Sequence, residues 1–112
     1  MPTEQARPRL ALASFPDRDV AARIGRTLVE ERLAACVTAI PAARSIYRWQ
    51  GAIEEADEVV CLIKTNADRI EALGERLRVL HPYRVPELLV LDVESGLPAY
   101  LSWLLRETRP EA

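Results

Sequence analysis

The hydrophobic pattern divides the chain into short apolar runs and stretches with helical periodicity. Apolar runs that end at a proline or a turn are typical of buried strands. They predict four strands, over residues 9–15, 34–49, 52–63 and 88–93. Apolar positions that recur every three or four residues predict two amphipathic helices, over residues 18–32 and 70–80, and a short third helix after Pro98.

Local signals mark the ends of the two long helices. Asp17 is a suitable N-cap for the first helix, and Thr65 with Asp68 fits a capping box before the second. His81 ends the second helix, because Pro82 disfavours helical geometry in the residue before it. The predicted order is therefore β-α-β-β-α-β followed by a C-terminal helix.

This order is the split β-α-β arrangement of ferredoxin-like α+β domains, in which a four-stranded antiparallel sheet carries two helices on one face. A chain of 112 residues has room for one domain, which we assign to residues 9–109. Residues 1–8 are polar, contain two prolines and are expected to form a flexible tail.

The central hairpin, with its turn at Gln50 and Gly51, is too long for a domain of this size. A strand from Leu33 to Trp49 would extend over about 56 Å, whereas the domain should have a diameter of roughly 34 Å. The distal end of the hairpin carries large apolar side chains, which are favoured at protein interfaces: Ile46, Tyr47, Trp49 and Ile53. We expect this end to pack on another subunit. The alternatives are that the strand is interrupted at Pro41 into a loop, or that the hairpin curls back onto its own helices and leaves a monomer.

Composition is that of an ordinary globular protein. Apolar residues make up 49% of the chain and charged residues 29%, and the net charge of −2 disfavours nucleic acid as a partner. No apolar stretch approaches the ~20 residues of a membrane span, and no secretory signal is visible, so a cytoplasmic location is expected. Cys36 and Cys61 lack zinc-type spacing and are interpreted as free thiols in strands.

Five segments follow one another in an order and spacing that resemble the CutA family of divalent-cation tolerance proteins. They are ERLAACV at 31–37, SIYRWQG at 45–51, IKT at 63–65, HPYRVPE at 81–87 and YLSW at 100–103. The resemblance extends over nearly the whole chain, from about Leu10 to Glu107.

This resemblance implies a ferredoxin-like subunit, a homotrimer whose hairpins reach across neighbours, and a role in tolerance to divalent cations, copper above all. The trimer is in turn similar to that of the PII nitrogen-signalling proteins, which suggests a small-molecule sensor by analogy of fold. Two positions depart from the family's usual pattern: Thr38 replaces an asparagine, and Ala42 replaces a glycine in the bend after Pro41.

His81 is the only histidine, so one subunit cannot form a site with several histidines. Imidazole is a good copper and zinc ligand, and His81 with Cys36 or Glu87, from the same or an adjacent subunit, could hold a metal. No cofactor is obligatory. The alternative for His81 is a hydrogen bond to the backbone at the end of the helix.

Lys64 and four aromatic residues are candidates for a ligand cleft between subunits. The aromatic residues are Tyr47, Trp49, Tyr83 and Trp103. Alternatively, Lys64 is simply solvated at the end of its strand, and the aromatic side chains serve only in packing.

An enzymatic role is not expected. Cys36 with His81 is the only nucleophile and base pair that the chain offers, and the glycine-rich phosphate-binding patterns are absent. The predicted function is a homotrimeric divalent-cation tolerance protein that binds copper, another divalent metal or a small ligand between subunits. The alternative is a PII-like trimer that senses a small anionic metabolite and acts on a protein partner.

Overall fold

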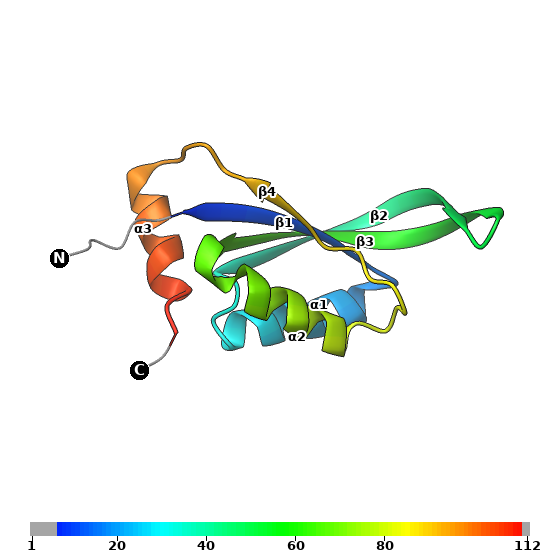
Figure 1. Ribbon diagram of the computed structural model, residues 1–112, viewed down its shortest axis with the longest axis horizontal. Helices are drawn as coiled ribbons and strands as arrows, with labels where there is room; N and C mark the ends of the chain where they lie inside the picture. The colour runs from blue at the N-terminus through cyan, green and yellow to red at the C-terminus, as the bar shows by residue number, and fades with distance from the viewer. Residues whose placement is uncertain (1–6, 111–112) are drawn as a thin grey trace.

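The computed structural model describes residues 7–110, which form a sheet, two long helices on one side of it and a third helix at one end (Figure 1). A single turn of 3-10 helix, η1 (Ala67–Arg69), precedes the second long helix. The elements follow in the order β1 (Pro8–Phe15), α1 (Arg18–Glu30), β2 (Cys36–Trp49), β3 (Ala52–Asn66), α2 (Ile70–Leu80), β4 (Leu89–Asp92) and α3 (Pro98–Glu107).

The four strands form one antiparallel sheet in the order β2-β3-β1-β4. α1 and α2 lie side by side below this sheet, and α3 stands near its end (Figure 1). The predicted ferredoxin-like α+β fold, with an extended β2–β3 hairpin and a C-terminal helix, is therefore confirmed.

The core fills the space between the sheet and the two long helices. Alternate residues of β1 and β3 face the helices, and helix residues spaced by three or four positions meet them. These buried residues include Ala11, Ala13, Phe15, Ile24, Leu28, Val59, Cys61, Ile63, Leu73 and Leu77. α1 lies close to β2, because a Cβ atom on Gly25 would come within 3.2 Å of Val37 Cγ1.

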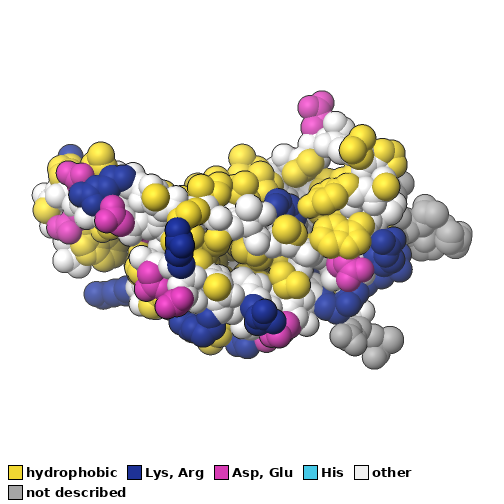
Figure 2. Space-filling model, turned by 180° about the vertical axis from the view of Figure 1, so that it is seen from behind, with side chains coloured by type: hydrophobic (Ala, Val, Ile, Leu, Met, Phe, Trp, Pro, Cys, Tyr) yellow, Lys and Arg dark blue, Asp and Glu magenta, His cyan; other side chains and the backbone are white. Residues whose placement is uncertain are grey.

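The opposite side of the sheet, which we call the open sheet face, is also apolar. Side chains from all four strands meet on it: Leu10, Leu12, Ile40, Val60, Leu62, Leu89 and Leu91. Figure 2 shows apolar side chains along the upper side of the molecule, over the sheet. Leu89 is 57% exposed and Leu91 45% exposed, which is unusual for leucines that adjoin one another on a sheet.

The distal half of the β2–β3 hairpin, residues 43–58, projects beyond the body of the domain (Figure 1) and is called the arm below. The molecule is 54 Å long, and its radius of gyration is 15.0 Å, against about 13 Å for a compact domain of this length. The hairpin therefore does not curl back onto its own helices.

A register shift between Ile40 and Ala43 separates the arm from the sheet. It is a β-bulge, which places Ala42 at a φ of 65°, a left-handed conformation that alanine rarely adopts. The family's usual glycine would accept this conformation freely. The bend predicted at Pro41 is thus present, and the departure at Ala42 makes it strained.

Five predicted strands and helices differ from the observed ones by one to three residues at an end, and two of these differences change the role assigned to a residue. Thr65 does not cap a helix: it is fully buried in β3, and its hydroxyl donates to the Leu33 carbonyl at 2.7 Å. The predicted tail ends too late: β1 begins at Pro8, and the Arg7 N–H donates to Asn66 Oδ1 at 2.7 Å. The rest of the predicted tail, residues 1–6, lies outside the described residues. The predicted cap is confirmed at Asp17, whose Oδ1 accepts from the Val20 N–H at 2.9 Å.

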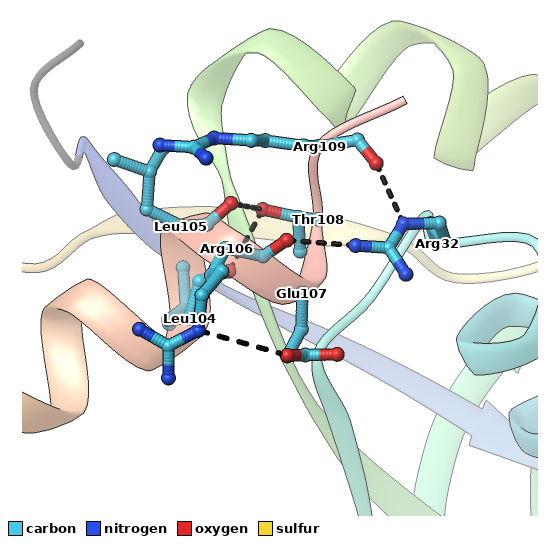
Figure 3. A network of polar contacts seen from close by, with 7 residues as sticks. All are labelled: Arg32, Leu104, Leu105, Arg106, Glu107, Thr108 and Arg109. Atoms are coloured by element: carbon cyan, nitrogen blue, oxygen red, sulfur yellow. Dashed lines mark hydrogen bonds and ion pairs between the residues drawn. The ribbon is translucent and has the colours of Figure 1, made fainter. Parts of the chain in front are cut away.

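Arg32 ties the end of α3 to the loop after α1 (Figure 3). Its Nε donates to the Arg109 carbonyl and its Nη2 to the Arg106 carbonyl, each at 2.7 Å. A positive charge at the carboxyl end of a helix is favoured by the helix dipole, and these bonds also satisfy carbonyls that the helix leaves without partners. Arg32 thereby fixes the helix that carries Trp103.

Candidate functional site

A cavity of about 710 Å³ lies where the arm meets the segment that follows α2. The arm supplies one wall, and residues 83–87 supply the other. The lining residues are Ser14, Ser45, Ile46, Tyr47, Trp49, Ala56, Glu58, Tyr83, Arg84, Val85 and Glu87. We call this cavity the arm pocket.

Glu58 is the most buried charged residue of the arm pocket, with an exposed fraction of 9%. Its Oε2 accepts a hydrogen bond from the Tyr83 hydroxyl at 2.6 Å. Among the ion pairs of residues 7–110, none includes Glu58. A nearly buried carboxylate without a cationic partner is costly, so a group that compensates its charge would bind favourably there.

Tyr83 keeps the phenol proton that this bond requires. Burial, and secondarily the hydrogen bond to Glu58, raise the pKa of Tyr83 well above its ordinary value. The phenol therefore stays protonated at all physiological pH values and acts as the donor. The short bond joins the 83–87 segment to the base of the arm.

His81 holds the start of that segment against β1. Its ring is buried and stacks on Phe15 with a centroid distance of 4.8 Å. The Tyr83 N–H donates to Nδ1 at 3.0 Å, which leaves Nε2 to donate its proton to the Ser14 carbonyl at 2.7 Å. Both ring nitrogens thus have backbone partners, and neither offers a free lone pair to a metal.

Glu87 lies at the rim of the arm pocket and is exposed. Its Oε1 accepts from the Ser14 hydroxyl at 3.0 Å. Ser14 therefore connects the two residues, because its carbonyl accepts from His81 while its hydroxyl donates to Glu87. Glu87 remains accessible to a ligand from outside.

Cys36 lies elsewhere, on the open sheet face beside Lys64. Lys64 Nζ donates to Thr38 Oγ1 at 2.6 Å and lies 3.6 Å from Cys36 Sγ. Thr38, which replaces the family's asparagine, thus still makes a polar contact beside Cys36. Lys64 is engaged in this cluster and is absent from the pocket lining.

One chain therefore does not assemble the predicted metal ligands. His81 is held at Ser14 and Cys36 at Lys64, and within residues 7–110 no three His, Cys, Asp or Glu residues form a group that could hold a metal. The same separation keeps Cys36 from acting as a nucleophile beside a His81 base. Within these residues, a site of three such side chains would require ligands from a second chain as well.

Three of the predicted cleft residues, Tyr47, Trp49 and Tyr83, do meet in the arm pocket. Trp103 does not, because it packs against Tyr100 on α3 with a centroid distance of 5.4 Å. Sequence reasoning missed Glu58, the central charge of the pocket. The alternation of side chains along β3 could have located Glu58, because residues two positions apart share a face and Glu58 lies two positions before Val60.

The family model for the CutA1 divalent ion tolerance protein matches residues 9–107. The chain belongs to the CutA1 family. The divalent-cation tolerance protein CutA of Thermus thermophilus is 46% identical over 99 residues, which cover 88% of this chain and 96% of that protein. The crystal structure of CutA from Xylella fastidiosa is 49% identical, with a TM-score of 0.90 over 93% of this chain and 100% of that one.

The location of this CutA1 chain stays a prediction. Within residues 7–110, no helix is both long enough and apolar enough to cross a membrane. One CutA of solved structure, from Archaeoglobus fulgidus, is described as periplasmic; it is 28% identical, with a TM-score of 0.88 over 91% of this chain and 99% of that one. The expected cytoplasmic location is therefore not confirmed.

We predict that Tyr83→Phe changes how stability depends on pH. The pKa of Tyr83 is raised in the folded protein, so the unfolded chain loses this proton first, and the free energy of unfolding should fall as the pH rises above about 10. In Tyr83→Phe the free energy of unfolding should not show this decrease above about pH 10. At neutral pH it should cost about 1 to 3 kcal/mol, because it leaves Glu58 without its donor.

Denaturant unfolding between pH 8 and 11.5 measures both effects. Tyr100→Phe is the matched control, because Tyr100 is exposed and has no carboxylate partner among the hydrogen bonds of residues 7–110. If the free energy of unfolding falls with pH by the same amount in the parent and in Tyr83→Phe, the Tyr83 proton does not contribute to stability.

Proposed function

We propose that this chain acts in divalent-cation tolerance as a non-enzymatic homotrimer that binds a divalent ion or a small ligand where subunits meet. The observation that supports this proposal best is the exposed apolar surface of the single chain. On the arm, Ile46 is 67% exposed and Ile53 is 61% exposed. Residues of this size are costly to leave in water.

The shape of that surface is compatible with a closed ring. An arm that reaches away from the domain can meet a different surface on its neighbour, and such head-to-tail contacts generate a ring when the rotation between subunits closes. The open sheet face is a second apolar surface that a neighbour could cover. Three subunits are the number that the family resemblance implies.

The arm pocket is the proposed binding site, because the arm that forms one of its walls would also contact the neighbour. A divalent ion would meet the accessible carboxylate of Glu87 at the pocket rim, with further ligands from the adjacent subunit. His81 would then position Ser14 and Glu87 without ligating the ion itself. An anionic metabolite is disfavoured, because two carboxylates and a single arginine line the pocket.

Sedimentation should show the mass of three 12.6-kDa chains at micromolar concentration. Trp49→Ala should weaken this assembly by about 2 kcal/mol or more per contact, because buried aromatic residues are frequent hot spots. Val79→Ala is the control, since Val79 is an exposed apolar residue of α2, away from the arm and the open sheet face. A parent that sediments as a monomer would contradict the proposal.

Calorimetric titration with Cu²⁺ tests the metal part. We expect the trimer to bind Cu²⁺ more tightly than Zn²⁺, and Glu87→Gln to lower the affinity at least tenfold. Glu94→Gln, which removes the same charge from an exposed loop, should leave the affinity unchanged. Equal affinity in the parent and Glu87→Gln would exclude Glu87 as a ligand, and absence of binding would contradict a metal-binding role.

A further inference from the structure

The hydrogen bonds of His81 determine its protonation state. A backbone N–H can only donate, so the bond of 3.0 Å from the Tyr83 N–H requires a Nδ1 without a proton. A carbonyl can only accept, so the bond of 2.7 Å to the Ser14 carbonyl requires a proton on Nε2. In this arrangement the imidazole is therefore neutral and has one specific tautomer. We call these two bonds the His81 latch.

A second proton on the ring is incompatible with the His81 latch. It would bind at Nδ1, because Nε2 already carries a proton, and the new N–H would then face the N–H of Tyr83. The ring is only 6% exposed and stacks on Phe15, so the positive charge would also lie among apolar groups. A protonated His81 is thus stable only if the ring leaves this position.

Acidic groups lie close to the latch and offer a protonated ring new partners. The Glu87 carboxylate accepts from the hydroxyl of the same serine whose carbonyl holds Nε2. On β3, Glu58 accepts from the Tyr83 hydroxyl at 2.6 Å. Asp17, in the turn after β1, also acts electrostatically on that hydroxyl. A cationic ring that moves away from its backbone partners therefore remains in an acidic environment.

The basic groups near the ring do not oppose this movement strongly. Arg84 is exposed, and Arg78 in the last turn of α2 is paired with Glu75 at 2.6 Å. His81 itself follows the carboxyl end of α2, where the helix dipole favours a positive charge. The chain therefore offers two arrangements for this ring: a neutral one held by the backbone, and a charged one held by carboxylates.

We propose that acid opens the arm pocket, because protonation of His81 breaks the latch and releases residues 82–87, which form one wall of the pocket. In the released state the imidazolium pairs with Glu87 or Glu58, and the Tyr83 N–H turns to solvent. This inference rests on the proposed function only for its consequence, since it names acid as a regulator of the proposed binding site. The latch itself consists of contacts within one chain.

The proton balance of the two states gives the direction and the pH range. The latched ring binds one proton and the released ring binds two, so a lower pH favours release. An imidazole in water takes up its second proton at about pH 6.5. The latch should therefore be intact above about pH 6.5, and each pH unit below this value should shift the equilibrium toward release by up to about tenfold. Ordinary carboxylates titrate at about pH 4 and stay charged in most of this range.

NMR of the full-length protein in its native oligomeric state tests the latch without any ligand. The chain has one histidine, so every imidazole nitrogen signal belongs to His81. Above about pH 7.5 these signals should show a neutral ring with its proton on Nε2. As the pH falls from about 7.5 to about 5, the protection of the Tyr83 amide against hydrogen exchange should decrease at least tenfold. The Ala35 amide, which donates to the Lys64 carbonyl at 2.8 Å, is the internal reference and should keep its protection.

Two variants separate the proton from the ring. His81→Asn keeps an acceptor at the position of Nδ1 and cannot take up a proton in this range, so its Tyr83 amide should stay protected down to about pH 5. His81→Phe keeps a ring on Phe15 and has no acceptor, so its Tyr83 amide should lack protection at every pH. If neither variant folds, the titration of the parent decides the question.

Two results would overturn the inference. One is a neutral ring that carries its proton on Nδ1, because such a ring cannot accept from Tyr83. The other is a Tyr83 amide that stays as protected as the Ala35 amide while the ring becomes protonated. Failure of the proposed function is a separate result: a protein that binds no Cu²⁺ or does not form a trimer would contradict that proposal, and the signals of the latch would still be measured.

Discussion

Uncovered apolar surface is the constraint on which the rest of this structure depends. The two long helices cover one face of the sheet, and the other face keeps leucines and an isoleucine in contact with solvent in the single chain. The arm adds further large apolar side chains, each worth about 1.5 to 3 kcal/mol when fully buried. A two-stranded ribbon of this kind is marginally stable alone, which is why we propose that a neighbouring copy holds the arm in this geometry.

On the same proposal, the neighbouring copy also helps to hold the arm pocket. One of its walls is the arm, and the other is the segment after α2, which a chain of hydrogen bonds holds in place. Ser14 bonds to His81, His81 to the Tyr83 backbone, and the Tyr83 hydroxyl to Glu58 on the hairpin. Since every donor in this chain of contacts has an acceptor, the pocket is organised before any ligand arrives, which lowers the entropic cost of binding.

Sequence patterns predicted the fold well, because the fold depends on periodicities that are local. The apolar runs of β1 and β3 and the spacing of Ile24 and Leu28 on α1 contain the residues of the core that the structure shows. The hairpin was also predictable, since its length and turn lie within one continuous segment. Thr65 was misassigned because a threonine near a helix start resembles a cap, whereas the packing of β3 buries it under Leu33.

The site was less predictable, because its contacts join residues far apart in the sequence. His81 looked like a metal ligand, but its two ring nitrogens are used by Ser14, 67 residues away, and by Tyr83. Cys36 and Lys64 were considered separately, and the register of β2 with β3 places them side by side. Glu58 gave only a weak signal, because its burial depends on Tyr83, which is 25 residues away in the sequence.

Hydrogen–deuterium exchange of the arm tests the central claim most directly. If a neighbouring copy covers the arm, the hydrogen-bonded amides of residues 43–58 should exchange about as slowly as those of β1 in the core. If the arm projects into solvent, those amides should exchange orders of magnitude faster than β1 while the core stays protected. The first result is the one that the account predicts, and the second would contradict it.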